Sequence, residues 1–518
     1  MKLRVLWRII SLVLLLGIFL AFLAFVKVYL NNTHNSSVNP VRSINYQEQS
    51  FYDQAFENVK DQNVSEEKIG GIIINHHLLA SNQIARSLTA AKNSDPQTII
   101  LISPNHFSAG YGRFISSVYD WQTPYGLIQT DTKLIKKLQD KDEYFNVDES
   151  PFINEHGIYG VLPFIKKVYP DAKIVPIIVK DQASAQEVDQ MAEILNQTIP
   201  KSSLIIGSFD FSHYLPSQAA DFSDIKNLAI LDNIDYNSAN FMDIDSKTGI
   251  RLMMKLLESR DYKQFNLVEH TNSSKITNDY NTPQTTSYIN GYWSRGEKIE
   301  NDKISLMYFG NWTAEGIKKF GIWNSQNYAL NNFDRLLAGT DLVIGQGTQA
   351  PETNFLGNLN YSGIINPANK LVQKNIRNTE ISFLKVANDS DVETLKNLNG
   401  RKLAQTDNPA LIDKIIAAGA KVIYEESAVQ KIEIRNNSAI IYGFGQMEFT
   451  NQAQPADDAI VGVETTNNSW ILHIMPVHFD KTIQLLSPNQ SVNVLARIAS
   501  ASFPELSEQI KTGIINLK

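Results

Sequence analysis

Cysteine is absent from this sequence of 518 residues. The chain therefore has no disulfide bond, no thiolate metal ligand and no cysteine nucleophile. Charge is also sparse, with 19% charged residues, a net charge of −7 and no clustered basic segment. Because nucleic-acid binding requires a concentrated basic surface, we expect no nucleic-acid partner. The hydrophobic fraction of 43% is that of an ordinary globular protein, and the length predicts two or three domains.

A long apolar run stands near the N-terminus, where three basic residues precede the uncharged segment Ile9–Val26. Its length is close to the roughly 20 residues that cross a bilayer. The basic flank favours a cytoplasmic N-terminus with the large domains extracytoplasmic. A cleaved signal peptide is the alternative, but the bulky segment Phe25–Tyr29 offers no small-residue cleavage site. We therefore expect a single-pass anchor in the cell membrane within residues 1–30, followed by a polar linker over 31–67.

Apolar runs and amphipathic segments alternate from residue 68 onward. Strand-like runs such as Ile72–Ile74 are followed by segments with helical spacing such as Ala185–Thr198. This alternation predicts an α/β fold with a largely parallel sheet and helices on both faces. The charged segment Glu297–Lys303 interrupts the pattern. We therefore predict one domain over residues 68–300 and a second, strand-rich α/β domain over 301–518.

Three histidines, His76, His106 and His213, each follow closely on a predicted strand. In open α/β sheets, ligands bind beyond the carboxyl ends of the strands. If the three strands are parallel neighbours, their imidazoles converge at one edge of the sheet. The alternative is that they are unrelated loop histidines.

Further polar residues beside apolar segments extend this candidate site, namely Glu155, His156 and Asp210. Imidazole and carboxylate together suit iron, zinc or copper. Asp210 is also placed to orient His213 as a general base. Glu155 and His156 precede a predicted helix, whose dipole favours a carboxylate and disfavours a cation, so we expect a neutral His156 with Glu155 as its orienting group. The competing interpretation is that each is a hydrogen-bonded structural group, which we prefer for His77 and His270.

Six ordered motifs within residues 68–295 resemble the Memo-like proteins, also called protein B of the AmmeMemoRadiSam system. The motifs are Gly71–His76, Ser103–His106, Trp121–Gly126, Glu155–Phe164, Asp210–Tyr214 and Thr285–Gly291. The resemblance implies a fold similar to that of the class III extradiol dioxygenases.

The same resemblance implies a metal centre, because members of the family bind a redox-active metal through two histidines and a cysteine. His76 and His106 match the two histidines, and the cysteine falls near Asp245-Ser246-Lys247, with Ser246 as the best alignment. Serine is a poor ligand for a soft metal, since only an ionised thiolate competes well there. The expected cofactor is one divalent ion (iron, copper or zinc) at His76, His106 and Ser246.

The second region, about 304–500, resembles the CapA-type metallophosphatase-like domain, which is calcineurin-like in fold. The resemblance rests on Leu411–Ile423, Val429–Arg435 and Ile441–Gln446. Where that family has His-Pro-His, this chain has Glu426-Ser427-Ala428, and Gly310-Asn311 stands at its Gly-Asp. A two-metal site needs a bridging carboxylate and several histidines. The resemblance therefore implies a degenerate, catalytically inactive domain.

These features leave two functions open. The first is a membrane-anchored, extracytoplasmic Memo-like protein with a mononuclear metal site that acts on or binds a small molecule. The alternative is a non-catalytic cell-envelope protein built from two degenerate enzyme domains, whose partner is an envelope polymer.

Overall fold

The computed structural model describes residues 39–43, 47–312, 332–347, 363–365, 370–425, 430–443, 456–479 and 483–517. Within these ranges no helix is both long and apolar enough to span a membrane. The predicted anchor, Ile9–Val26, lies outside the described residues, so membrane attachment stays a prediction.

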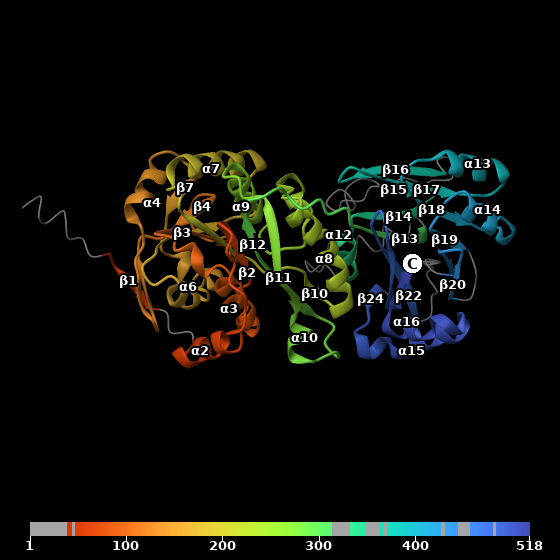
Figure 1. The fold of residues 1–518 in the computed structure, drawn as a ribbon, viewed down its shortest axis with the longest axis horizontal. Helices are drawn as coiled ribbons and strands as arrows, with labels where there is room; N and C mark the ends of the chain where they lie inside the picture. Colours follow the sequence, from red (N-terminus) through yellow and green to blue (C-terminus); the bar gives the residue numbers. More distant parts are fainter. Residues whose placement is uncertain are drawn as a thin grey trace, which may run out of the picture.

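A mixed sheet forms the centre of the first region (Figure 1). Its described strands are β2 (Ile69–Ile74), β3 (Thr98–Pro104), β4 (Phe114–Ser116), β7 (Phe145–Val147), β8 (Lys173–Val179), β9 (Leu204–Ser208), β10 (His213–Leu215), β11 (Gln264–Asn272) and β12 (Thr285–Ser294). They run in the order β10-β12-β2-β9-β3-β8-β4-β7, and β11 pairs with β12. The central strands β2, β9, β3 and β8 are parallel and buried almost throughout, as expected for strands covered on both faces. The predicted parallel pairing holds for this centre, whereas β12 and β4 join it antiparallel; at the edge, β4 and β7 are again parallel.

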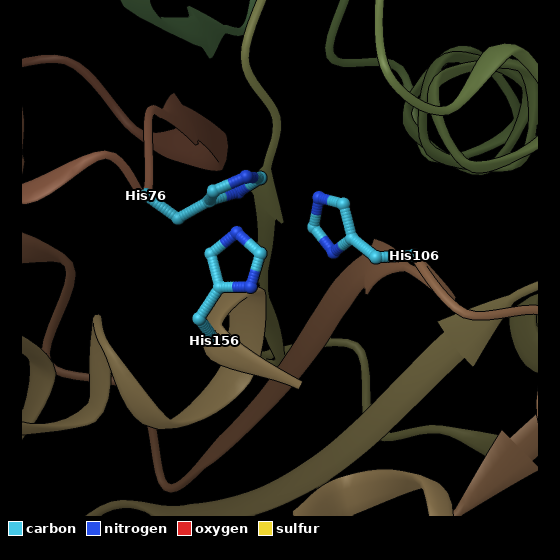
Figure 2. A group of neighbouring side chains, drawn as sticks. All are labelled: His76, His106 and His156. Carbon is cyan, nitrogen blue, oxygen red and sulfur yellow. The ribbon is translucent and has the colours of Figure 1, made fainter. Parts of the chain in front are cut away.

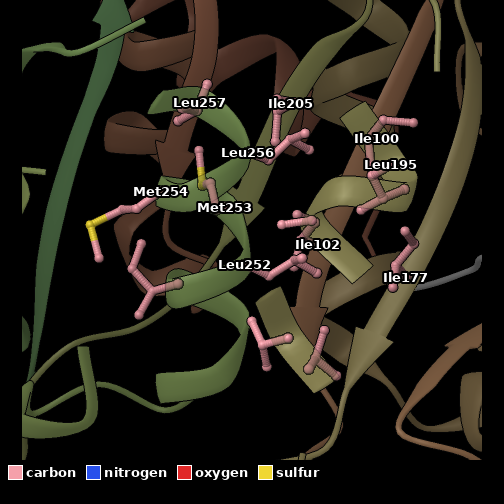
Figure 3. Packing of buried hydrophobic residues seen from close by; sticks show 14 of the residues in the cluster. Ile100, Ile102, Ile177, Leu195, Ile205, Leu252, Met253, Met254, Leu256 and Leu257 are labelled. Carbon is pink, nitrogen blue, oxygen red and sulfur yellow. The ribbon is translucent and has the colours of Figure 1, made fainter. Parts of the chain in front are cut away.

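Helices cover both faces of this sheet, as predicted. Along β3, Ile99 and Leu101 belong to one buried cluster and Ile100 and Ile102 to another, because successive side chains of a strand point to opposite faces. The first cluster is closed by α3 (Ser81–Ala90) and α6 (Leu162–Val168), and the second by α4 (Thr132–Gln139), α7 (Ala185–Thr198) and α9 (Lys247–Ser259). Figure 3 shows the second cluster, with α9 packed over the sheet.

The helix predicted next to His156 is divided in two. A short helix, α5 (His156–Tyr159), ends before α6, which begins at Leu162. Pro163 lies in the first turn of α6, where its missing N–H has no helical partner to lose. His156 is consequently the first residue of a helix rather than the residue before one. The predicted polar loop before β12 also contains a short helix, α10 (Ser273–Thr277).

Part of the predicted linker is folded onto the first domain. Strand β1 (Val41–Ser43) pairs in parallel with β5 (Asp120–Thr123), which pairs with β6 (Gly126–Ile128). Helix α2 (Gln49–Glu57) buries Tyr52 completely, with its ring 4.9 Å from that of Phe164. The polar composition of this stretch concealed a narrow apolar face, so the structure differs here from the predicted linker.

The second region consists of two sheets that pack around a common core. In the described residues, the first sheet has the order β15-β14-β13-β22-β23-β24, with β25 on β23, and the second β16-β17-β18-β19-β21-β20. The strands of the first sheet are β13 (Ile304–Trp312), β14 (Leu342–Gly347), β15 (Gly363–Ile365), β22 (Ala456–Thr465), β23 (Trp470–Phe479), β24 (Ile483–Leu485) and β25 (Ile514–Leu517). Those of the second are β16 (Leu371–Ile376), β17 (Thr379–Lys385), β18 (Arg401–Thr406), β19 (Val422–Glu425), β20 (Lys431–Arg435) and β21 (Ser438–Tyr442). Its helices are α12 (Asn332–Gly339), α13 (Asp389–Asn397), α14 (Ile412–Ala417), α15 (Pro488–Ala501) and α16 (Ser507–Thr512).

The two regions meet through helix α8 (Ser217–Asp232) of the first (Figure 1). Its side chains Ala219, Phe222 and Ile225 share one buried cluster with residues of the second region, including Leu336 and Met475. Each region thus has two buried clusters of its own, and a fifth apolar cluster joins the regions.

Candidate metal centre

The carboxyl ends of three neighbouring parallel strands form the candidate site. Strand β9 lies between β2 and β3, and the residues just beyond these strands include His76, His106 and Asp210. Figure 2 shows the imidazoles of His76 and His106 meeting that of His156, which comes from α5. The His76 ring centroid is 5.0 Å from each of the other two, and the His106 and His156 rings stack at 4.2 Å. The predicted convergence at the sheet edge is therefore present for His76 and His106, and His156 joins them in place of His213.

Glu155 fixes the orientation of His106. Its carboxylate lies 2.6 Å from the His106 Nδ1 and accepts the His106 backbone N–H at 3.0 Å. It also caps α5 by accepting the Gly157 N–H at 3.1 Å. Burial favours a higher pKa for Glu155, but the hydrogen bond and charge of His106 outweigh it, so the pKa is lowered. We expected Glu155 to orient His156; it orients His106 instead and leaves the His106 Nε2 available.

Ser208 fixes the orientation of the His76 imidazole. The Ser208 hydroxyl donates to the Gly157 carbonyl at 2.6 Å and lies 3.2 Å from the His76 Nδ1, so it accepts the Nδ1 proton. This hydrogen bond leaves the Nε2 lone pair free for a ligand. Burial, reinforced by the nearby histidines His106 and His156, lowers the pKa of His76 well below its usual value. The imidazole is therefore neutral at pH 7, the form that binds metals.

Asp245 faces both of these histidines, a contact that the sequence did not reveal. Its Oδ2 lies 3.3 Å from the His76 Nε2 and 3.9 Å from the His106 Nε2. Its Oδ1 is buried and has no hydrogen-bond partner. Burial, followed by the charge of Asp210, raises the pKa of Asp245 well above its usual value. The available signal was the acidic residue next to Ser246 in the stretch that aligned with the family's cysteine.

Ser246 occupies a different role from the predicted one. It is the N-cap of α9, and its hydroxyl accepts the Gly249 N–H at 3.1 Å. A serine before a helix satisfies one of the unpaired N–H groups of the first turn in this way. The carboxylate that meets His76 and His106 belongs to the preceding residue, Asp245.

Asp210 faces His76 rather than His213. One oxygen accepts the His76 backbone N–H at 3.1 Å, the other lies 3.5 Å from the His76 Nε2, and its own N–H donates to Asp245 at 2.9 Å. Burial raises the pKa of Asp210. Among the described residues no hydrogen bond joins Asp210 to His213, so the predicted orienting contact is absent there. His213 opens strand β10, and burial lowers its pKa.

The remaining histidines of the first region are hydrogen-bonded, as expected for structural groups. His77 Nδ1 lies 2.7 Å from the Tyr288 hydroxyl, and His270 Nε2 lies 2.8 Å from Asp224. Burial lowers the pKa of His156, which agrees with the neutral imidazole that we expected.

Two overlapping groups of side chains are spaced to hold a metal ion. The first is His76, His106 and His156, and the second is His76, Asp210 and Asp245. In the described part of the second region no such group occurs, and Glu426-Ser427-Ala428 lies outside the described residues. His473 and His478 each pair with one carboxylate, at 3.2 Å to Glu464 and 2.7 Å to Asp457.

Comparisons with known proteins show which family the first region is similar to. Residues 45–291 match the family model of the Memo-like proteins. A MEMO1 family protein of Nitrosopumilus maritimus is 26% identical over 163 residues, which cover 30% of this chain and 58% of that protein. One from Methanocaldococcus jannaschii is 28% identical over 199 residues, covering 35% of this chain and 68% of that protein. This chain thus spans little more than half the length of the first relative.

Among solved structures, an uncharacterized protein from Escherichia coli K12 has 12% identity and a TM-score of 0.31, covering 43% of this chain and 99% of that chain. That score is too low to support an inference. The family match covers the region that carries His76, His106 and Asp245. Over residues 45–291, somewhat less than half of its length, the chain is therefore similar to the Memo-like proteins.

Proposed function

We propose that the Memo-like domain binds one divalent metal ion through the Nε2 atoms of His76 and His106 and the carboxylate of Asp245. The observation that carries this proposal is that both Nε2 atoms face the same carboxylate oxygen, at 3.3 and 3.9 Å. Ligands held about 2.1 Å from one ion lie roughly 3–3.5 Å apart, so a small adjustment brings all three into coordination.

The donor set fits a metal ion on three further counts. The buried Asp245 Oδ1 has no hydrogen-bond partner, and a buried carboxylate is costly unless it is paired or bound to metal. The Nδ1 atoms of His76 and His106 both have hydrogen-bond partners, an arrangement that fixes metal-binding histidines. Two histidines and one carboxylate, without a thiolate, favour non-haem Fe(II) or Zn(II) over Cu(I).

The ion would supply a Lewis acid with open coordination positions for a small molecule. Residues around the ion would position its ligands and accept protons. Glu155 and Ser208 hold the two imidazoles, and Asp210 donates its N–H to the Asp245 carboxylate. Burial keeps His156 and His213 neutral, so each is able to accept a proton from a ligand bound beside them. We therefore propose a metal-dependent enzyme that acts on a small molecule.

Metal content of the purified full chain tests this proposal. After chelation, repletion with Fe(II) or Zn(II) and desalting, we expect about one ion per chain. His106→Ala and Asp245→Ala should each reduce this strongly, whereas His478→Ala, which removes an imidazole from the second region, should not. If the wild type retains no metal, or if the variants retain as much as the wild type, the proposal fails.

The alternative proposal is a non-catalytic cell-envelope binding protein, anchored by residues 9–26 and carrying a degenerate CapA-like second region. Its support is the apolar run Ile9–Val26 with its basic flank, and the histidines missing from the aligned CapA-type motifs. Membrane fractionation, followed by added protease on intact spheroplasts, tests the anchor. Complete protection of the large domains would rule out the outward orientation, and failure to retain any envelope polymer in a pull-down would rule out the binding role.

A further inference from the structure

Arg335 of the second region has a buried N–H without a hydrogen-bond partner in the described structure. Its guanidinium carbon lies 4.5 Å from the centroid of the Tyr214 ring. Its Nε is buried without a hydrogen-bond partner, and its positive charge partly offsets the rise that burial causes in the pKa of the Asp243 carboxyl. Arginine is always ionised in proteins and presents five N–H donors. The contact with the Tyr214 ring uses no N–H hydrogen bond, so the buried Nε–H remains unsatisfied.

The position of Arg335 is set by the contact between the two regions. In α12 the next residues, Leu336 and Leu337, are buried in the cluster that also contains Leu215 of β10. The buried Lys226 of α8 caps the C-terminal end of α12, because its ammonium group donates to the carbonyls of Ala338 and Thr340. The positive charge of Lys226 at the C-terminal end of α12 also complements the helix dipole. Arg335 is therefore held beside β10.

Strand β10 connects Arg335 to the candidate metal centre. Tyr214 follows His213 directly, and their ring centroids are 5.9 Å apart. The pKa of His213, lowered mainly by burial, is lowered further by the charges of Arg335 and of His106. His213 in turn contributes to the lowered pKa of His76. Arg335 thus acts electrostatically on the same group of histidines, although it belongs to the other region.

The backbone of Tyr214 is strained in a way that favours this contact. Its φ angle is +62°, which is uncommon for a bulky residue, and such strain concentrates at functional sites. The side chain is 51% exposed, and Phe107, next to His106, is 62% exposed. Exposed aromatic side chains therefore follow two of the histidines of the site directly.

From these contacts we propose that Arg335 binds the carboxylate of a small-molecule ligand whose remaining atoms lie over Tyr214 and reach the histidines. A single guanidinium matches the single charge and two oxygens of a carboxylate. The inference rests on the proposed function, because it assumes that the histidines form the metal site. Its test does not, because carboxylate binding is also measured on the metal-free protein. It gives the second region a role in ligand selection.

Calorimetric titration of the full chain with benzoate tests this assignment, because the benzoate ring suits the exposed aromatic residues. Benzamide serves as the neutral isostere and phenyl phosphate as the alternative anion. The variants are Arg335→Gln and Arg335→Lys. Arg295→Gln is the matched control, because Arg295 also stacks on a tyrosine, at 5.5 Å from the Tyr262 centroid. Each titration is run on chelated and on metal-repleted protein.

We expect benzoate to bind more tightly than benzamide or phenyl phosphate. Arg335→Gln should weaken benzoate about tenfold, which is typical of a lost charged hydrogen bond, and Arg335→Lys should weaken it less. Arg295→Gln should change nothing. Unmeasurable benzoate binding, equal affinity for benzoate and benzamide, tighter binding of phenyl phosphate, or an unchanged Arg335→Gln variant would each overturn the proposal. Metal content of Arg335→Gln should equal that of the wild type, so loss of metal binding and loss of carboxylate binding are separate results.

Discussion

At the scale of single residues, the histidines of the site were predictable and the carboxylate was not. His76 and His106 each stand within a few residues of the end of an apolar run, so the rule that ligands gather at strand ends finds them. Asp245 follows no such run. It reaches the site because Ile244 bridges Phe211 and the Asp245 N–H donates to the Asp210 carbonyl at 3.1 Å. Pairings between segments this far apart leave no local pattern in the sequence.

The buried carboxyl group of Asp245 is expected to lower the stability of the metal-free protein while it allows metal binding. Its pKa in the folded, metal-free chain is raised above the usual 3.8, so the folded state binds the proton more tightly than the unfolded state does. Stability is therefore lost as pH rises from the unfolded pKa through the folded one. At pH 7, Asp245→Asn should raise the unfolding free energy of the chelated protein by roughly 1–2 kcal/mol and remove its metal.

Thermal unfolding at pH 7 and at mildly acidic pH measures this effect, and the gain should shrink at the lower pH. Destabilisation by Asp245→Asn at pH 7 would show that the ionised carboxylate is stabilising without metal.

At the scale of elements, the buried strands and amphipathic helices were predictable because their patterns are local. Helix α7 begins and ends at the predicted residues, since Ser184 and Glu187 form a capping box at its start. The pattern of apolar residues continues across the division between α5 and α6, and Pro163 is the residue that marks it in the sequence. The role of Ser246 was also missed, since a serine that caps a helix and a serine that replaces a cysteine look alike in sequence.

A comparison of two helix N-caps, Ser246 and Ser184, distinguishes a capping role for Ser246 from a metal-binding role. Ser246→Ala and Ser184→Ala each remove a side chain that accepts an N–H of the first turn, so each should cost about 1 kcal/mol of stability. Metal content should stay at the wild-type level in both. Loss of metal in Ser246→Ala alone would mean that the hydroxyl is a ligand after all.

At the scale of the whole molecule, the charged segment Glu297–Lys303 marked the change from one region to the next, and it connects β12 to β13 without regular structure. The contact between the regions was not predictable. Helix α8 is buried on most of its surface, so its sequence lacks a clear polar face and gives no sign of which side meets which partner.

This contact predicts that the regions stay together when the connection is cut. Trypsin cleavage at Lys298 or Lys303 should give two fragments that elute together in gel filtration. Phe222 supports the contact, with its ring 5.0 Å from that of His473. Phe222→Ala should cost roughly 3–5 kcal/mol and allow the fragments to separate. Phe145→Ala, a buried change within the first region, should destabilise without separating them. Separation of the wild-type fragments would show that the regions are independent.

The position of a bound ion tests the central claim most directly. Crystals of the full chain, grown with Fe(II) or Zn(II) and measured at the absorption edge of the metal, give an anomalous difference map. The account predicts one peak within about 2.0–2.3 Å of His76 Nε2, His106 Nε2 and a carboxylate oxygen of Asp245. A map with no peak there, or a peak coordinated by Ser246 Oγ with the Asp245 carboxylate out of reach, would contradict it.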